Sequence, residues 1–144
     1  MLDLIIKNGS CYIDKDLKDQ DIAIKDGKII EIGTIDVEAK EIFDAKELTV
    51  LPGCIDTQTH FREPGSTDTE DLHSGSRAAI AGGITSVFEM PNTNPPTSTK
   101  AEFQKKLDLA KNRMYCNYAF YFGATADNAS ELADLVNLEG CCGI

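Results

Sequence analysis

The sequence predicts an α/β protein in which a small β-sheet module precedes strands that alternate with helices. From Leu2 to about Leu51, short apolar alternations are interrupted by turn residues. From Leu51 onward, apolar strands recur at a spacing of roughly thirty residues, the size of a βαβ unit. We therefore expect two domains, residues 1–51 and 52–144. The second would be a parallel sheet with outer helices, either doubly wound or part of a (β/α)8 barrel, since a complete barrel needs about 250 residues.

The expected strands of the β module each run into a turn. Their apolar residues are Leu2, Leu4 and Ile6 before Gly9, Ile22 and Ile24 before Asp26-Gly27, and Ile30 and Ile32 before Gly33. The Asp26-Gly27 pair suits a tight hairpin, because glycine tolerates the positive φ that such turns need.

The second region contains four expected strands. The apolar residues Val50, Leu51, Cys54 and Ile55 begin the first; the others are Ile84 to Met90, Tyr115 to Phe122, and one that starts at Cys141.

Three helices are expected between these strands. The first starts near Thr69, directs Leu72, Ala79 and Ile80 inward and stops at Gly82-Gly83. The second opens with Thr99 and Glu102 at capping-box spacing, and places Phe103, Leu107, Ala110 and Met114 at helical spacing. The third begins near Asn128, with Glu131 three residues later, and buries Leu132, Leu135 and Val136.

Composition restricts the possible partners. The 24 acidic and 14 basic residues leave a formal net charge of -10, which opposes general binding to nucleic acid or anionic lipid. No segment approaches the roughly 20 apolar residues that span a bilayer, and we expect a cytoplasmic protein. The five cysteines lack a C-x-x-C pairing, so we expect reduced, mostly buried thiols.

Polar side chains gather at the end of the first strand of the second region, in LPGCIDTQTHFREPG, Leu51 to Gly65. Alternation along this strand aims Asp56, Gln58, His60 and Arg62 to one face. His60 there could ligate a metal or relay protons, and a structural hydrogen bond is the alternative. Asp56 could orient a ligand, or it could cap the strand-to-loop turn.

Two further polar residues lie where a ligand could bind. Arg62 precedes a stiff Glu-Pro-Gly turn and could grip a carboxylate with its planar fork, or pair locally with Glu63 or with the acidic helix start. Asn92 follows the second strand and could hydrogen-bond a ligand or initiate an Asx-turn. His73 is expected to be an exposed helical residue, and the adjacent Cys141 and Cys142 to be small core residues.

Two segments together resemble a known family. PGCIDTQTHFREPG and SGSRAAIAGGITSVFEMPNTNPPT, between Pro52 and Thr97, closely resemble the cyclic amidohydrolase superfamily, and within it the dihydroorotases of the larger bacterial type. The N-terminal DLIIKNG and the closing GCCGI also fit, so the resemblance spans essentially the whole chain. The Arg-Glu-Pro-Gly run favours dihydroorotase over the related hydantoinases and allantoinases.

The resemblance implies the first three to four βα units of a TIM-type (β/α)8 barrel, preceded by a small N-terminal β-sandwich module. It also implies zinc and the interconversion of N-carbamoyl-L-aspartate and L-dihydroorotate in pyrimidine synthesis. The family's H-x-H metal ligands fall on Gln58 and His60, and Arg62 and Asn92 match positions that bind the substrate carboxylate. The family's catalytic residues are expected beyond Ile144, so we expect this chain alone to be inactive.

Gln58 departs from the family pattern, since a neutral amide is a poorer zinc ligand than imidazole. Three hypotheses follow. The chain is part of an active dihydroorotase; or of a non-catalytic dihydroorotase-like partner of aspartate carbamoyltransferase, which Gln58 favours; or of an amidohydrolase for another cyclic amide, of the allantoinase or hydantoinase type. A homo-oligomer is compatible with each.

Overall fold

The computed structural model describes residues 1–144, apart from the side chain of Val136, so the expected burial of Val136 lies outside the described residues. The chain divides into two compact units, Met1–Pro52 and Gly53–Ile144. Among the described residues, no helix is long and apolar enough to cross a membrane.

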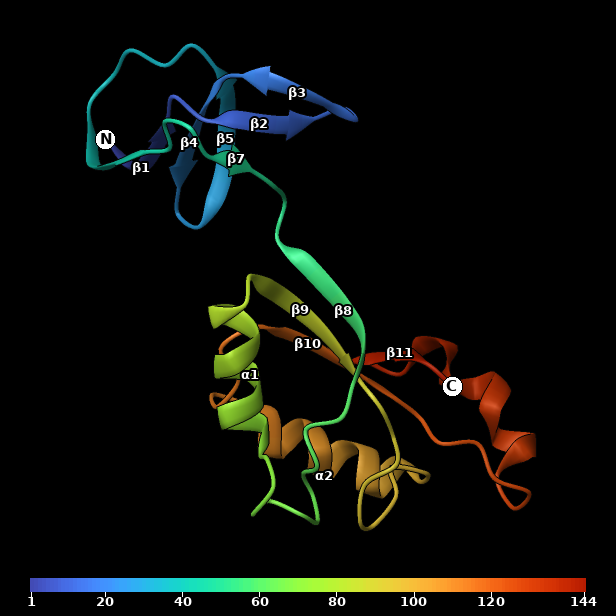
Figure 1. Ribbon diagram of the computed structural model, residues 1–144. Helices are drawn as coiled ribbons and strands as arrows, with labels where there is room; N and C mark the ends of the chain where they lie inside the picture. Colours follow the sequence, from blue (N-terminus) through green and yellow to red (C-terminus); the bar gives the residue numbers. More distant parts are fainter. The chain divides into compact units, whose positions relative to one another are not determined.

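The first unit consists of β-strands only (Figure 1). One four-stranded sheet has the order β5-β4-β1-β6, and a three-stranded sheet has the order β3-β2-β7. The strands are β1 (Leu2–Lys7), β2 (Ser10–Ile13), β3 (Asp16–Asp19), β4 (Asp21–Lys25), β5 (Lys28–Gly33), β6 (Ala39–Asp44) and β7 (Thr49–Val50).

The hairpin expected at Asp26-Gly27 joins β4 to β5. Both residues have positive φ, 51° and 71°, as a type I′ turn requires. The fully buried residue of β1 is Ile5 rather than Leu2, Leu4 or Ile6, and it packs with Ala23 and Ile35 in a small core.

The second unit alternates strands and helices. Its elements are β8 (Cys54–Thr59), α1 (Leu72–Ala81), β9 (Ile84–Glu89), α2 (Lys100–Ala110), β10 (Asn117–Tyr121), the 3-10 helix η1 (Ala129–Asn137) and β11 (Cys141–Gly143). All four strands are parallel, in the order β11-β10-β9-β8. This confirms the expected α/β architecture, a β module followed by parallel βα units.

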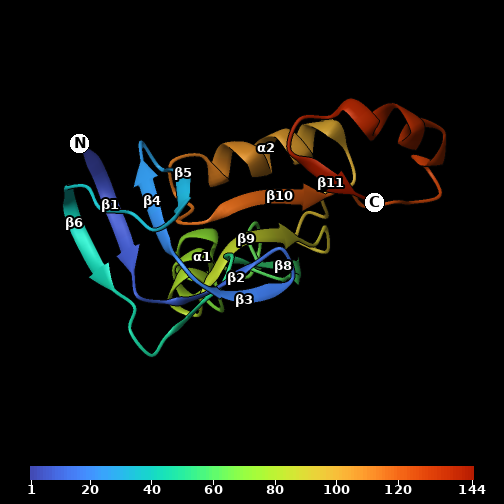
Figure 2. The ribbon, with the colours of Figure 1, turned by 90° about the horizontal axis from the view of Figure 1, so that it is seen from above.

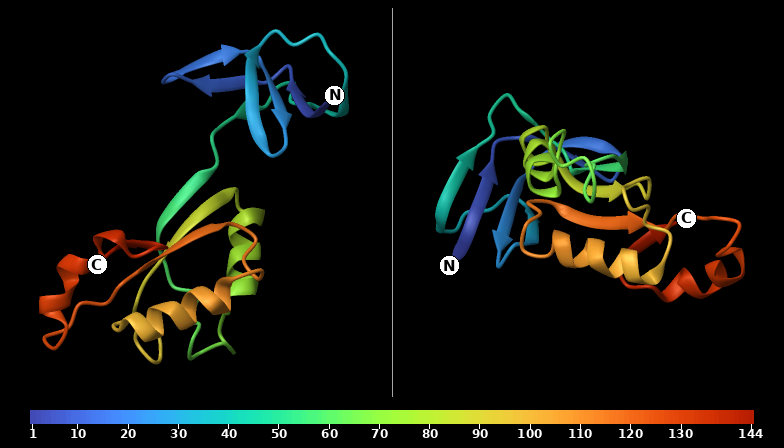
Figure 3. Two further views of the ribbon diagram at one scale, coloured as in Figure 1. Left: turned by 180° about the vertical axis from the view of Figure 1, so that it is seen from behind. Right: turned by 90° about the horizontal axis from the view of Figure 1, so that it is seen from below.

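The core of this unit lies between the sheet and its helices. In Figure 2, α2 lies alongside β10, and Phe103 of α2 contacts Phe120 of β10 at a ring-centroid distance of 6.3 Å. Leu72 of α1 and Leu135 of η1 belong to the same buried cluster, and β11 extends the sheet beyond β10 (Figure 3).

The first strand of this unit is shorter than expected. Val50 belongs to β7, and the chain breaks at Pro52-Gly53 before β8 begins at Cys54. Leu51 and Ile55 are 60% and 57% exposed, so the expected continuous apolar strand is wrong. Gly53 is required at this break, because a Cβ atom there would collide with the side chain of Thr85.

The helix boundaries correct two further expectations. Helix α1 begins at Leu72 rather than near Thr69, with Asp71 as its cap, and stops at Gly82 as expected. Ile80 is exposed, because the inward face follows Leu72, Ser76 and Ala79 and Ile80 lies one step past it.

The third helix also differs from expectation. It is a 3-10 helix, and Asn128 does not cap it with its side chain. The Asn128 amide instead accepts from the Thr125 N–H at 2.8 Å and donates to the Ser98 carbonyl at 2.8 Å and the Gly123 carbonyl at 2.9 Å. Asn128 therefore ties the loop after β10 to Ser98 in the segment before α2.

Candidate functional site

The carboxyl ends of β8 and β9 lie side by side, since Thr59 pairs with Glu89 in the parallel register. Glu89 is in turn paired with Phe120 of β10. Polar residues that follow neighbouring strands therefore come together at the carboxyl ends of the strands, which is where open and closed α/β sheets bind ligands.

His60 and Asn92 contact each other at these strand ends. His60 follows β8 and Asn92 lies in the loop after β9, and the His60 Nδ1 atom is 2.8 Å from the Asn92 Oδ1 atom. With the Asn92 Oδ1 atom facing the ring, that oxygen can only accept, so in this arrangement Nδ1 carries the proton. In the neutral form of that tautomer Nε2 carries the lone pair, and the Asn92 Nδ2 group keeps two donors for a ligand.

Gln58 lies near the end of β8, two residues before His60, and its side chain is exposed. The Asp56 Oδ1 atom accepts from the Gln58 backbone N–H at 3.0 Å, which is a local contact within the strand. Among the described residues, no three His, Cys, Asp or Glu side chains lie close enough to share a metal ion. One imidazole and one amide fall short of the three or more protein ligands of a zinc site, so these residues do not by themselves fit that metal.

Arg62 is exposed and has a left-handed backbone, with φ at 62°. Such a backbone costs on the order of 1–3 kcal/mol in a non-glycine residue, and it occurs often at functional sites. No acidic side chain among the described residues forms an ion pair with Arg62. The alternative interpretation, a local ion pair with Glu63 or with the acidic helix start, is therefore not observed, and the guanidinium is available to a ligand.

Arg113 takes the role of partner to Glu63 instead. Its Nη1 and Nη2 atoms lie 2.8 and 3.1 Å from the two Glu63 carboxylate oxygens, and the Leu72 N–H donates to Glu63 at 2.9 Å. This bidentate bond to Glu63 raises the pKa of Arg113. Glu63 thus ties the loop after His60 to the start of α1 through Leu72 and to the segment after α2 through Arg113. Sequence reasoning missed the ion pair because the two residues are 50 positions apart.

A second ion pair, also missed, is completely buried. Lys106 of α2 and Glu89 of β9 contact each other with side-chain exposures of 0% and 1%. Burial lowers the pKa of Lys106 and raises that of Glu89, and each partner opposes the shift of the other. The sequence carried a signal here, because Lys106 lies at helical spacing between the core residues Phe103 and Ala110.

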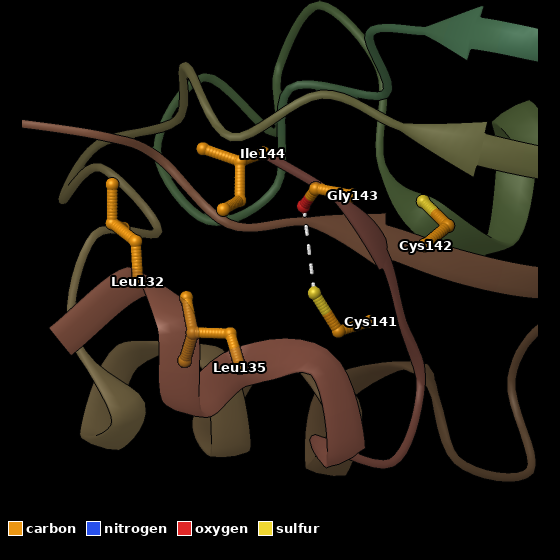
Figure 4. Close-up of a pocket in the computed structure, with 6 residues that line it drawn as sticks. All are labelled: Leu132, Leu135, Cys141, Cys142, Gly143 and Ile144. Carbon is orange, nitrogen blue, oxygen red and sulfur yellow. Dashed lines mark hydrogen bonds between the residues drawn. The ribbon is translucent and has the colours of Figure 1, made fainter.

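The remaining candidates do not join the site. His73 is an exposed residue of α1, as expected, and its Nε2 atom lies 3.3 Å from the Tyr115 hydroxyl. Cys141 and Cys142 line a shallow pocket with Leu132, Leu135 and Ile144, and their sulfurs point to different sides of β11 (Figure 4). Burial raises the pKa of Cys142 to about 11, so this thiol is not activated.

The expected burial of the cysteines holds for only some of them. Cys11 and Cys116 are buried, Cys141 and Cys142 are half-buried, and Cys54 is exposed; all five are free. Cys54 lies at the start of β8, at the edge of its sheet, where no neighbouring strand among those described covers it.

Residues 49–138 match the model of the amidohydrolase family. The chain belongs to the amidohydrolase family. Among curated proteins, this amidohydrolase chain is 42% identical over 134 residues to an allantoinase of Escherichia coli O1:K1, covering 92% of the chain and 30% of the relative. The allantoinase of Escherichia coli O139:H28 matches with the same identity and coverage.

Solved amidohydrolase structures share the fold. L-hydantoinase (dihydropyrimidinase) from Arthrobacter aurescens superposes with a TM-score of 0.85 at 33% identity, over 94% of this chain and 31% of the hydantoinase. D-hydantoinase (dihydropyrimidinase) from Thermus sp. gives a TM-score of 0.74 at 27% identity, over 92% of this chain and 31% of that protein. The chain thus spans about 30% of the length of these relatives.

These matches support the cyclic amidohydrolase assignment and correct its finer part. The relatives are named allantoinases and hydantoinases, so the matches do not support dihydroorotase as the specific activity. The Arg-Glu-Pro-Gly run was too short a feature to separate these activities.

Proposed function

We propose that this chain forms the N-terminal part of a cyclic amide hydrolase of the allantoinase and hydantoinase type. The observation that carries the proposal is the contact between His60 and Asn92 at the carboxyl ends of β8 and β9. His60 offers an Nε2 lone pair to a proton or a metal ion. Asn92 offers amide donors that can hold the ring carbonyl of a substrate in a fixed orientation.

The family resemblance implies zinc, which would polarise the ring carbonyl and supply hydroxide when bound. In a protein of the relatives' length, further ligands would come from later strands, with His60 contributing one imidazole. The contribution of this chain's residues is to orient the ring through Asn92 and, at His60, to offer one nitrogen lone pair that either binds the metal or, where no metal is bound, accepts a proton.

The test is hydrolysis of allantoin and hydantoin by a protein that includes this chain, compared with its His60→Ala and Asn92→Ala variants. We expect both variants to lose at least about 100-fold in kcat/KM, the range that positioning and general acid–base effects provide. His73→Ala is the matched control, because His73 lies on the outer helix, and it should retain activity. Full activity in His60→Ala would contradict the proposal.

Arg62 favours a second candidate, dihydroorotase. Its exposed guanidinium suits a ring that carries a carboxylate, which dihydroorotate has and hydantoin lacks. We expect Arg62→Ala to raise the KM for dihydroorotate by roughly 10- to 100-fold, or about 1.5–3 kcal/mol for a charged hydrogen bond, and to leave allantoin or hydantoin nearly unaffected. Arg77→Ala, an exposed arginine of α1, is the control. An unchanged KM for dihydroorotate would contradict this candidate.

Gln58 favours a third candidate, a non-catalytic protein that associates with aspartate carbamoyltransferase. The discriminating measurement is zinc content before and after Gln58→His. If residue 58 is a metal ligand, the Gln58→His protein should bind more zinc than the unmodified protein, because imidazole is a better zinc ligand than an amide. Equal zinc stoichiometry in both proteins would show that position 58 does not bind the metal.

A further inference from the structure

Burying the ion pair of Glu89 and Lys106 costs desolvation free energy that apolar side chains in the same place would not cost. Both side chains are almost fully removed from solvent, and Lys106 also lies 5.0 Å from the centre of the Phe120 ring. Taking two charges out of water costs several kcal/mol per ion, and apolar residues of similar volume are often as stabilising or more so. The charged pair therefore needs an explanation beyond filling space.

Each member of the pair also binds a backbone group at the site. The Glu89 Oε1 atom accepts from the Phe61 N–H at 3.2 Å, and Phe61 directly follows His60. The Lys106 Nζ atom donates to the Met90 carbonyl at 3.0 Å, two residues before Asn92. The pair thus joins the segment that carries His60 to the segment that carries Asn92.

We propose that Glu89 and Lys106 are positioning residues that set the separation of His60 and Asn92, and through it the Nδ1–H tautomer of His60. The importance of that tautomer for chemistry rests on the proposed function, whereas the contact between His60 and Asn92 is observed independently of it. Ion pairing fixes Glu89 and Lys106 against each other, so the two backbone segments they hold cannot shift independently.

A purely structural role makes a different prediction. If the pair only filled the core, its replacement by two apolar residues would leave the strand ends in place. If the pair positions the strand ends, the same replacement would preserve the core but remove the hydrogen bonds to the Phe61 N–H and the Met90 carbonyl.

The experiment is nuclear magnetic resonance of the 15N-labelled whole chain, which contains only two histidines. The nitrogen shifts of an imidazole report which nitrogen carries the proton, and His73 serves as internal reference. We expect the unmodified chain to show the Nδ1–H form for His60. The double variant Glu89→Leu with Lys106→Met should fold and lose that form in favour of a mixture of tautomers.

Val87→Ala is the matched control, because Val87 is fully buried on β9 two residues before Glu89. It should lower stability and keep the His60 tautomer. If the double variant does not fold, the single variant Glu89→Gln retains the acceptor for Phe61 and should show an intermediate loss. A folded double variant, or a folded Glu89→Gln, with an unchanged His60 signature would overturn the proposal.

A second measurement separates this proposal from the proposed function. In a protein with hydrolase activity, the double variant should lower kcat by roughly 10- to 100-fold, as misplacement of reacting groups does, with a smaller change in KM. Absence of hydrolysis in the unmodified protein would contradict the proposed function only, since the tautomer measurement does not depend on turnover.

Discussion

The two units differ in the size of their hydrophobic cores and in whether charged side chains are buried in them. The buried cluster of the first unit has three residues, Ile5, Ala23 and Ile35, with Cys11, Ile22 and Ala45 buried outside it, whereas that of the second has nine among the described residues, including Phe103 and Phe120. The first unit keeps its ion pairs at or near the surface, and the second buries a carboxylate and an ammonium completely. A sheet covered by helices has the depth to fix polar groups in place, and the candidate site lies on that sheet.

The first unit also leaves much of its apolar surface uncovered. Ile29, Ile30 and Ile32 of β5 are 60%, 55% and 42% exposed. Its sheets are therefore stabilised more by backbone hydrogen bonds than by a deep core, and we expect it to be the less stable unit.

The largest expected effect is a loss of stability confined to the second unit. Phe120→Ala should destabilise the second unit by about 3–5 kcal/mol, because it removes a fully buried ring that contacts Phe103 and Tyr118. Hydrogen exchange measured residue by residue should show the loss in β8 to β10 and leave β1 and β4 unchanged. Equal loss in both units would mean that they unfold together.

The reciprocal change tests the first unit. Ile5→Ala should cost about 2–4 kcal/mol, since Ile5 is fully buried but its core is small enough to relax around the gap. The exchange of β1 and β4 should accelerate while β9 keeps its protection. A largely exposed residue of the same unit, such as Ile29 at 60% exposure, should tolerate the same substitution with little loss.

A smaller effect is expected where charge is only partly buried. Arg113→Met should cost about 1–2 kcal/mol, because it leaves Glu63 without its bidentate partner while the arginine itself is 36% exposed. Arg113→Lys should recover part of this loss but not all, since an ammonium cannot form the two parallel bonds. Urea denaturation of the three proteins measures the difference, and identical midpoints would show that the pair is not stabilising.

The features of this fold that could be predicted from the sequence depend on residues that are close together along the chain. The Asp26-Gly27 hairpin, the stop of α1 at Gly82 and the cap of α2 by Thr99 each involve residues a few positions apart. The same holds for the placement of His60 and Asn92 after consecutive strands, because parallel strands end at one edge.

The parts that could not be predicted depend on distant partners. The bond from Arg113 to Glu63 and the pair of Lys106 with Glu89 join segments that only the folded sheet brings together. Lys106 was recognisable as a charge on an apolar helix face, but nothing local identifies Glu89 as its partner. For Arg62 the sequence left two interpretations open, a carboxylate ligand or a local ion pair, and among the described residues no ion pair of Arg62 is observed.

The smallest expected effect is the response of each unit to acid. The bonds from the Ser74 N–H and hydroxyl lower the pKa of Asp71, which caps α1, and the bonds from Lys40 and the Asp26 N–H lower the pKa of Asp3 in β1. A carboxyl whose folded pKa is lowered contributes stability above its unfolded pKa and loses it as pH falls through the folded pKa. Both units should therefore weaken below about pH 4, where unfolded aspartates begin to take up protons.

The two aspartates allow this acid response to be assigned. Asp71→Asn keeps an oxygen that can cap α1 but cannot titrate, so the second unit should lose less of its stability between pH 5 and pH 3 while the first unit behaves as before. Asp3→Asn should do the reverse. Hydrogen exchange of α1 and β1 amides across that pH range provides the measurement. If either substitution changes the acid response of both units equally, the two units share one unfolding equilibrium and their separation into two cores has no thermodynamic meaning.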